Sequence, residues 1–335
     1  KYPPGSGNTG IITLTAALGH SACGACASFR PVTATTTLRA LCRGLLPAAV
    51  VCACACAGPA RGATLAMPDW QQLVFEQRSF WARARGEVTL KRGVAPLFPD
   101  TQADPFLRIE VQNTVGASIE SIVVDVAGDD VACLARWRLS RGRDQRLKTH
   151  RYLDEAVLRE RREPAAASGD REALRGADSR WVSSGVTRVP LPPAAASRRL
   201  LSPHALFLLL PGLLDRPQLA DDYLLHTDLN FFRLEVDAIR EERVRSAFRL
   251  DGDEINGERR VRALTLRVLP LPGNPEAPDF ELMGLSGAIT VLVDEATGLP
   301  LKLRGEAPRI GSAELNLVEA QTRPALARAT AVRLP

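Results

Sequence analysis

The sequence has almost no cysteine outside its N-terminal part. Six of its seven cysteines lie within the first 63 residues, and only Cys133 follows them. A disulfide framework is therefore excluded for the rest of the chain. The Cys23-x-x-Cys26 pair has no second pair or histidine cluster at ligand spacing, so neither a zinc site nor a redox motif is expected. Cys133 is expected to be a small buried side chain rather than a nucleophile.

The chain also lacks an excess of charge beyond its first part. The formal net charge of +5 comes from 43 basic and 38 acidic residues. Residues 1–63 hold five of the basic residues and no acid, which leaves 38 residues of each sign in the remainder. Nucleic-acid binding depends on a basic excess gathered on one face, so no nucleic-acid partner is expected.

No linear motif of a common enzyme class is present. The sequence contains no GxSxG elbow, Walker loop, GxGxxG turn or HExxH helix. The segment Asp251–Gly257 is spaced like a calcium loop, but Ile255 stands where that loop requires Asp or Asn. A non-enzymatic protein with no cofactor and no metal site is therefore expected.

The first 66 residues have the layout of an export signal behind an extension. Residues 1–37 are rich in Gly, Ser, Thr and Ala without apolar periodicity, which predicts an upstream or disordered extension. Arg39 and Arg43 then precede an apolar run at 45–57 and a series of small residues. This order of positive, apolar and small residues predicts a signal peptide over 38–66.

The apolar run of this segment is shorter than the roughly 20 residues that a membrane span needs. Export, with removal of the signal, is therefore preferred to an N-terminal membrane anchor. The protein is expected to be periplasmic or secreted. A lipoprotein acylated at Cys54 is a second hypothesis, which rests on a loose match of Val51–Cys54 to the acylation signal.

The most apolar stretch after the predicted signal is Leu200–Leu214, and it predicts a short buried helix. Ser202 and Pro203 suit the N-cap and first helical position, and Pro211-Gly212 is expected to end the helix. The helix, over about 202–210, has no polar face. Such a helix is normally buried on all sides.

Strict alternation of apolar and polar residues fills most of the remaining chain and predicts strands. The clearest runs lie at about 80–91, 107–111, 119–126, 133–139, 232–236, 244–250, 264–268, 283–293, 299–303 and 313–317. Most of these runs are joined by short connections, and short connections join antiparallel strands. Asn256-Gly257 is expected to form a tight turn between two of them.

One segment breaks this alternation. Residues 159–163 read Arg-Glu-Arg-Arg-Glu and lead into a polar stretch without an apolar face, so a mobile loop is expected near 160–180. The rest predicts a single, mainly β domain over 67–325. Its expected fold is a curved antiparallel sheet, or half-open barrel, wrapped around the short helix.

Residues 200–320 carry a resemblance to a known group of proteins. The similar segments are the Ser202–Leu210 helix, the Asp228–Phe232 approach to a strand and the closing strands at 291–294, 299–303 and 311–315. A weaker likeness lies at Trp70–Leu90. The chain here resembles an uncharacterised family of exported bacterial proteins with a domain of unknown function. The resemblance implies a half-barrel around a central helix, similar to that of periplasmic lipoprotein carriers.

The leading hypothesis for function is binding of a lipid or other apolar ligand between sheet and helix. The apolar positions of the predicted helix and of the sheet face that it covers are the candidates to line such a site. The candidates are Leu206, Phe207, Leu210, Phe232, Phe248, Leu266 and Ile289.

Two further hypotheses come from other classes. An envelope scaffold or assembly factor would bind anionic glycans or a membrane surface through Arg243, Arg245 and Arg249. A hydrolase without a linear motif would need His226 within hydrogen-bond reach of an acid in the segment 221–228, namely Asp221, Asp222 or Asp228. The sequence does not predict the oligomeric state.

Overall fold

The computed structural model describes residues 65, 67–78, 83–101, 106–142, 145–164, 181–274, 280–307 and 311–323. The predicted extension, Cys54 and the predicted signal peptide except Leu65 lie outside these residues. So do Phe80 and the part of the predicted mobile loop at 165–180.

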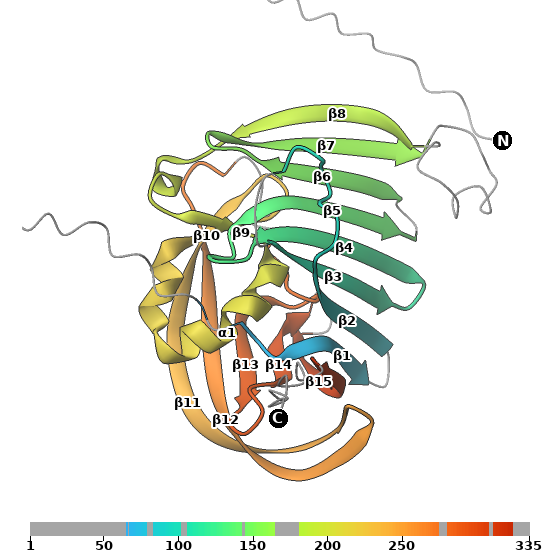
Figure 1. Cartoon of the computed structure of the whole chain (residues 1–335), viewed down its shortest axis with the longest axis vertical. Helices are drawn as coiled ribbons and strands as arrows, with labels where there is room; N and C mark the ends of the chain where they lie inside the picture. Colours follow the sequence, from blue (N-terminus) through green and yellow to red (C-terminus); the bar gives the residue numbers. More distant parts are fainter. Residues whose placement is uncertain are drawn as a thin grey trace, which may run out of the picture. The chain divides into compact units, whose positions relative to one another are not determined.

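Strands make up most of the described chain and belong to one sheet (Figure 1). Its fifteen described strands are β1 (Trp70–Arg78), β2 (Arg83–Arg92), β3 (Phe106–Val115), β4 (Ser118–Ala127), β5 (Cys133–Arg141), β6 (Arg146–Tyr152), β7 (Ala156–Pro164), β8 (Trp181–Pro190), β9 (Arg199–Leu201), β10 (Tyr223–His226), β11 (Phe231–Leu250), β12 (Asp253–Pro270), β13 (Ser286–Asp294), β14 (Pro300–Ala307) and β15 (Gly311–Thr322).

The strand order is β8-β7-β6-β5-β4-β3-β2-β1-β15-β14-β13-β12-β11-β10-β9. Neighbouring strands are antiparallel except β9 and β10, and a short parallel pairing also joins β11 to β15. The first strand, β1, pairs with the last one, β15, which joins two antiparallel runs into one sheet. The mainly β prediction is confirmed: the sheet is curved and does not close into a barrel.

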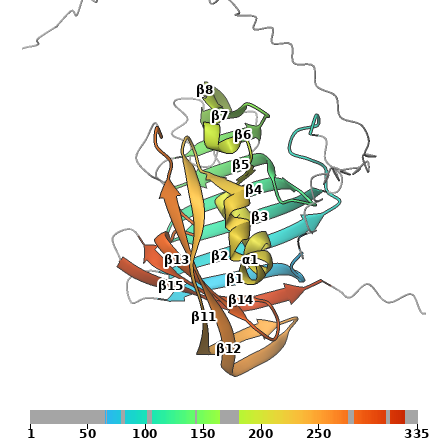
Figure 2. The same cartoon turned by 90° about the vertical axis from the view of Figure 1, so that its left-hand side faces the viewer.

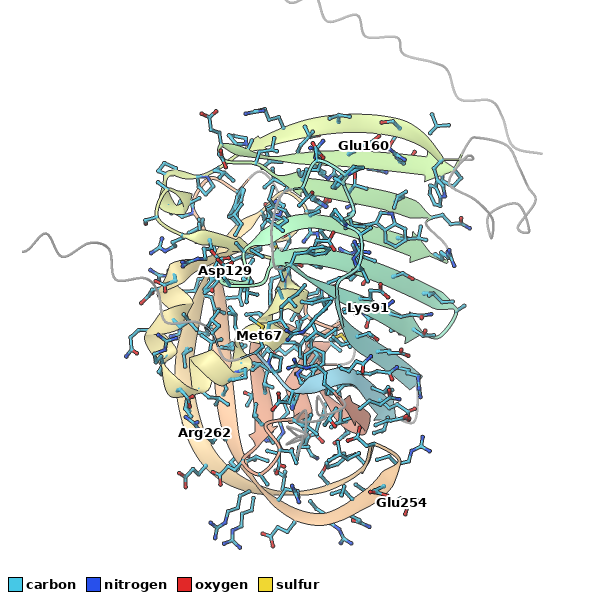
Figure 3. All side chains as sticks on the ribbon, in the orientation of Figure 1. Met67, Lys91, Asp129, Glu160, Glu254 and Arg262 are labelled. Atoms are coloured by element: carbon cyan, nitrogen blue, oxygen red, sulfur yellow. The ribbon has the colours of Figure 1, made fainter. Side chains whose placement is uncertain are left out.

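The helix α1 (Leu206–Asp215) lies inside the curve of the sheet (Figures 1 and 2). A 3-10 turn at Pro203–Ala205 precedes it. Phe207 contacts the rings of Trp70 and Phe75 on β1, at centroid distances of 6.5 and 6.0 Å. Side chains fill the space between α1 and the sheet (Figure 3). The prediction of a helix buried on all sides is therefore confirmed.

The predicted bounds of this helix, 202–210, are wrong. The α-helix begins four residues after Ser202 and continues through Pro211 to Asp215. Pro211 lacks the N–H that would bond the carbonyl of Phe207, and an interior proline costs about 3 kcal/mol. Burying each large apolar side chain contributes about 1.5–3 kcal/mol, and most of the helix is buried leucine. Burial thus outweighs the lost hydrogen bond. The buried leucines are Leu206, Leu208, Leu209, Leu210, Leu213 and Leu214.

The predicted turn at Asn256-Gly257 is also wrong, because both residues pair within β12. The hairpin turns instead at Asp251-Gly252, whose φ angles are 53° and 97°. Two positive φ angles define the tight turn that suits antiparallel strands, and Asp-Gly meets this requirement as well as Asn-Gly. The Asp251 carboxylate accepts bonds from the N–H and hydroxyl of Thr322, at 2.7 and 2.5 Å, which ties this turn to β15.

The Arg-rich segment 159–163 does not begin a loop. It lies within β7, which continues to Pro164 and pairs with β6 and β8 on either side. Its alternation gives no apolar face, because both faces of the strand carry charged residues at 159–163. Among the residues that the structure describes, no helix is long and apolar enough to cross a membrane.

The burial of α1 leads to a prediction about stability. Leu208 is fully buried, so Leu208→Asp would place a carboxylate in an apolar interior, at a cost of several kcal/mol against a typical total of about 5–15. We expect this variant to unfold or to melt at a much lower temperature. The same change at the exposed Val182 of β8 is the control. Similar melting curves for the two variants would contradict the role of α1 as the core of the fold.

Candidate functional site

The seven side chains predicted to line an apolar ligand site belong to the packed core. They come from α1, β11, β12 and β13, and none is more than 5% exposed. None of them borders four pockets that described residues line elsewhere in the fold. A ligand held by these seven side chains would have to displace α1 or its packing. The residues are Leu206, Phe207, Leu210, Phe232, Phe248, Leu266 and Ile289.

The predicted arginine stripe lies on the exposed face of the β11–β12 hairpin. Two of its three members have acidic partners: Arg243 lies 3.7 Å from Glu258, and Arg249 lies 2.9 Å from Glu319. Arg245 has no ion pair with a described residue. Exposed pairs of this kind contribute little to stability, but they reduce the positive field that an anionic surface would meet.

The acid–base pair predicted for a hydrolase is not assembled. His226 is buried, and its Nδ1 lies 3.2 Å from the hydroxyl of Tyr152 rather than beside a carboxylate. Asp221 and Asp222 are exposed. The side chain of Asp228 is occupied by other partners, so the predicted mechanism lacks its geometry.

Asp228 is the centre of a buried ionic cluster on the inner face of β6 and β7. Arg159 donates two bonds to its carboxylate, from Nε at 2.6 Å and from Nη2 at 2.9 Å. Lys148 donates a third, and the Nε2 of His150 lies 3.3 Å from Oδ1. Burial alone would raise the pKa of Asp228, but the bonds from His150, Arg159 and Lys148 outweigh it and hold that pKa well below its usual range.

Arg136 on β5 connects this cluster to the loop between β10 and β11. Its Nη1 donates to the carbonyl of His226 at 2.9 Å, and its Nη2 donates to the carbonyl of Thr227. Its Nε lies 3.4 Å from Nδ1 of His150, and its Nη2 lies 3.2 Å from Nε2 of the same ring. Arg136 is 5% exposed and forms no ion pair with a described carboxylate. The buried guanidinium of Arg136 therefore donates only to neutral hydrogen-bond acceptors.

Arg136 and Arg138 face the concave side because of a β-bulge. Asp125 pairs with Ala135 and Val126 pairs with Cys133, which leaves Leu134 as an extra residue. One extra residue reverses the alternation, so Cys133 faces the core while the next inward positions are 136 and 138. Strict alternation from Cys133 would turn Ala135, Trp137 and Leu139 toward the concave side in place of the arginines. Cys133 itself is buried as predicted, and burial raises the pKa of its thiol to about 12.

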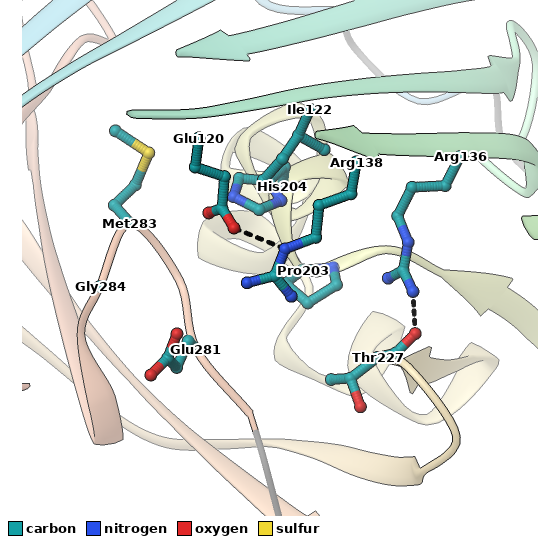
Figure 4. Close-up of a pocket in the computed structure, with 10 residues that line it drawn as sticks. All are labelled: Glu120, Ile122, Arg136, Arg138, Pro203, His204, Thr227, Glu281, Met283 and Gly284. Carbon is teal, nitrogen blue, oxygen red and sulfur yellow. Dashed lines mark hydrogen bonds and ion pairs between the residues drawn. The ribbon is translucent and has the colours of Figure 1, made fainter. Parts of the chain in front are cut away.

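A cavity of about 40 Å³ lies beside Arg136 and Arg138 (Figure 4). Its walls come from the inner faces of β4 and β5, from the 3-10 turn before α1, from the loop after β10 and from the turn before β13. This volume holds a few water molecules at most. The lining residues are Glu120, Ile122, Arg136, Arg138, Pro203, His204, Thr227, Glu281, Met283 and Gly284.

Two side chains present unused polar atoms in this cavity. The Nε of Arg138 donates to Glu120 at 2.5 Å, and its Nη1 and Nη2 have no hydrogen-bond partner among the described residues. The Nδ1 of His204 is buried and also has no partner there. Burial, followed by the charges of Arg138 and Arg136, lowers the pKa of His204 to about 3.

Sequence reasoning did not find this arrangement. Arg136, Arg138 and His204 are neither clustered in sequence nor part of a linear motif, and the two arginines follow a bulge that composition does not reveal. In the described part of the chain, no group of His, Cys, Asp and Glu side chains is arranged to hold a metal ion.

The buried histidines lead to a prediction about pH. Burial, followed by the charge of Arg136, lowers the pKa of His150 to about 3, and burial places the pKa of His226 well below 6.5. Below pH 6.5 the unfolded chain binds protons that the folded chain does not. The free energy of unfolding therefore keeps its full value above pH 6.5. As the pH is lowered below 6.5, it decreases by about 1.4 kcal/mol per pH unit for each histidine. Urea unfolding at pH 7, 6 and 5 measures this slope, which His150→Asn should reduce.

A second prediction concerns Asp228 itself. Asp228→Asn leaves Arg159 and Lys148 without their carboxylate, and breaking a buried pair in this way costs about 3–5 kcal/mol. We expect a correspondingly lower free energy of unfolding at pH 7. Asp221→Asn, at an exposed position nearby in sequence, is the matched control. Equal stability of the two variants would show that the cluster contributes nothing to the fold.

Comparisons with known proteins add no family to this picture. No family model, no curated protein and no solved structure matches this chain. The resemblance of residues 200–320 to a family of exported bacterial proteins therefore stays a prediction. What the protein does has to be inferred from the residues of the cavity.

Proposed function

We propose that the protein is a non-enzymatic binding protein that holds a small anionic group, such as a carboxylate or a phosphate, beside Arg138 and His204. One observation carries this proposal: the free Nη1 and Nη2 of Arg138 and the unpartnered Nδ1 of His204 border the same small cavity. An anion would give all three nitrogens the partner that the described residues do not supply.

The ion pair with Glu120 supports this role for Arg138. Glu120 takes the Nε bond and leaves the two terminal nitrogens, which form the planar fork that binds carboxylate or phosphate through two hydrogen bonds. Neutral His204 can carry its proton on Nδ1 and donate a further bond. Glu281 also borders the cavity, so a bound anion lies on the arginine side, away from this second carboxylate.

Arg136 contributes charge rather than hydrogen bonds. Its nitrogens already bind the carbonyls of His226 and Thr227 and the ring of His150. Arg136 forms no ion pair with a described carboxylate, and it is 5% exposed, so water screens its charge only weakly. An anion in the cavity would offset that charge.

Binding is a better fit to these residues than catalysis. Recognition of an anion needs donors and positive charge, both of which the cavity supplies. Hydrolysis needs a nucleophile and a base within hydrogen-bond reach, and His226 does not lie beside the acids predicted for that role. The proposal keeps the sequence-based expectation that the protein is exported to the periplasm or secreted.

The test is anion binding by the full chain and by Arg138→Gln. Acetate and inorganic phosphate are titrated separately and followed by NMR, which distinguishes the two head-group chemistries. Loss of a charged hydrogen-bond pair worth about 1.5–3 kcal/mol should weaken binding about tenfold or more. Arg245→Gln removes an equal charge from the exposed face of β11 and should bind like the unaltered chain. Equal binding by Arg138→Gln would refute the proposal.

A further inference from the structure

A larger groove adjoins the cavity beside Arg138. This groove has a volume of about 330 Å³ and shares five lining residues with the cavity, so the two lie next to each other. Its volume is at the lower end of the range for small-molecule sites. The shared residues are Glu120, Arg138, Glu281, Met283 and Gly284.

The groove runs along β5, away from the polar end of the cavity. Arg138, Ser140 and Gly142 line it at intervals of two residues, which places them along one face of the strand. At about 3.3 Å per residue, the path from Arg138 to Gly142 is about 13 Å long. A ligand anchored at Arg138 therefore has room for an extended chain in one direction.

The far part of the groove has one exposed apolar side chain. Val115, at the end of β3, is 52% exposed, and Met283 lines the part that the groove shares with the cavity. A large aliphatic side chain left half in water gains free energy when a ligand covers it. Asn113 and Ser140 also line the groove, so a chain lying there meets a mixed surface and gains less than full apolar burial.

One wall is held in place by an unusual backbone turn. Leu282 and Leu285 exchange backbone hydrogen bonds of 2.8 and 3.0 Å, and between them Met283 and Gly284 have φ angles of 56° and 80°. A positive φ is uncommon for a residue with a side chain and is sustained only where the surroundings enforce it. The side chain of Met283 packs on Gly86, where a Cβ would lie 2.1 Å from its terminal methyl group. The wall is therefore preformed.

We infer that the ligand is an amphiphile with a single short apolar chain, whose anionic head lies at Arg138 and His204 and whose chain follows β5 toward Val115. This inference rests on the proposed function and names the class of its ligand. The limited volume favours a free medium-chain carboxylate over a lipid with two acyl chains. This site differs from the apolar site predicted from the sequence, because the apolar chain of the ligand lies along β5 and not against the core face of α1.

The experiment compares acetate, hexanoate and octanoate, with octylamine as a probe of equal chain length and opposite charge. Calorimetric titration of the full chain measures each affinity. Each methylene that leaves water can tighten binding up to about fourfold, so octanoate should bind at least about tenfold more tightly than acetate. Octylamine should bind far more weakly than octanoate.

Variants separate the two parts of the site. Val115→Ser should weaken octanoate by about two- to fourfold and leave acetate unchanged, because it removes apolar contact only. Val182→Ser changes an equally exposed valine of β8 outside the groove and should alter neither affinity. Arg138→Gln should weaken both carboxylates.

The outcomes distinguish this inference from the proposed function. If acetate and octanoate bind equally, and the binding of both depends on Arg138, the proposed site for the apolar chain of the ligand is wrong and the proposal of anion binding stands. If octanoate binds more tightly than acetate but independently of Arg138, the anion site is wrong. If octylamine matches octanoate, or Val115→Ser has no effect, the inference is overturned.

Discussion

The fold depends on hiding a helix that has no polar side. Every residue of α1 from Leu206 to Leu210 is buried, so no orientation of this helix on a flat sheet would keep its surface from water. The sheet meets this requirement by curving around it. Buried side chains of β1–β4 and of β11–β13 belong to the same apolar cluster as those of α1. The pairing of the first and last strands, β1 and β15, completes the curve beneath the helix.

The polar site lies where this apolar packing ends. The 3-10 turn at Pro203–Ala205 and the loop after β10 bring backbone carbonyls and His204 against the inner face of β5. Arg136 donates to the carbonyls of His226 and Thr227, and a buried carbonyl that lacks a donor costs free energy comparable to a lost hydrogen bond. The charge of Arg136, once placed there, is also the origin of the electrostatic character of the adjoining cavity. Structural and binding roles thus come from the same strand.

The fold was largely predictable from the sequence, but its irregular positions were not. Alternation identifies strands, and the run Leu206–Leu210 identifies a buried helix, because each pattern extends over many residues. Local signals were less reliable where two of them compete. Asp251-Gly252 and Asn256-Gly257 both suit a tight turn, and only tertiary pairing with Thr322 selects the first. Pro211 stayed in the helix because burial, which no local rule measures, outweighed its missing N–H.

The candidate site was not predictable, for a related reason. The extra residue Leu134 reverses the faces of β5, and a rule based on strict alternation assigns its arginines to the wrong side of the sheet. Their partners come from segments up to about ninety residues away, such as the carbonyls of His226 and Thr227. Places where a local rule fails are often functional, because a fold retains a strained or charged arrangement only at a cost in stability. A bulge that turns two arginines inward, next to an unpartnered histidine, is such a place. We therefore assign the binding role to this end of β5 and not to the apolar face of α1.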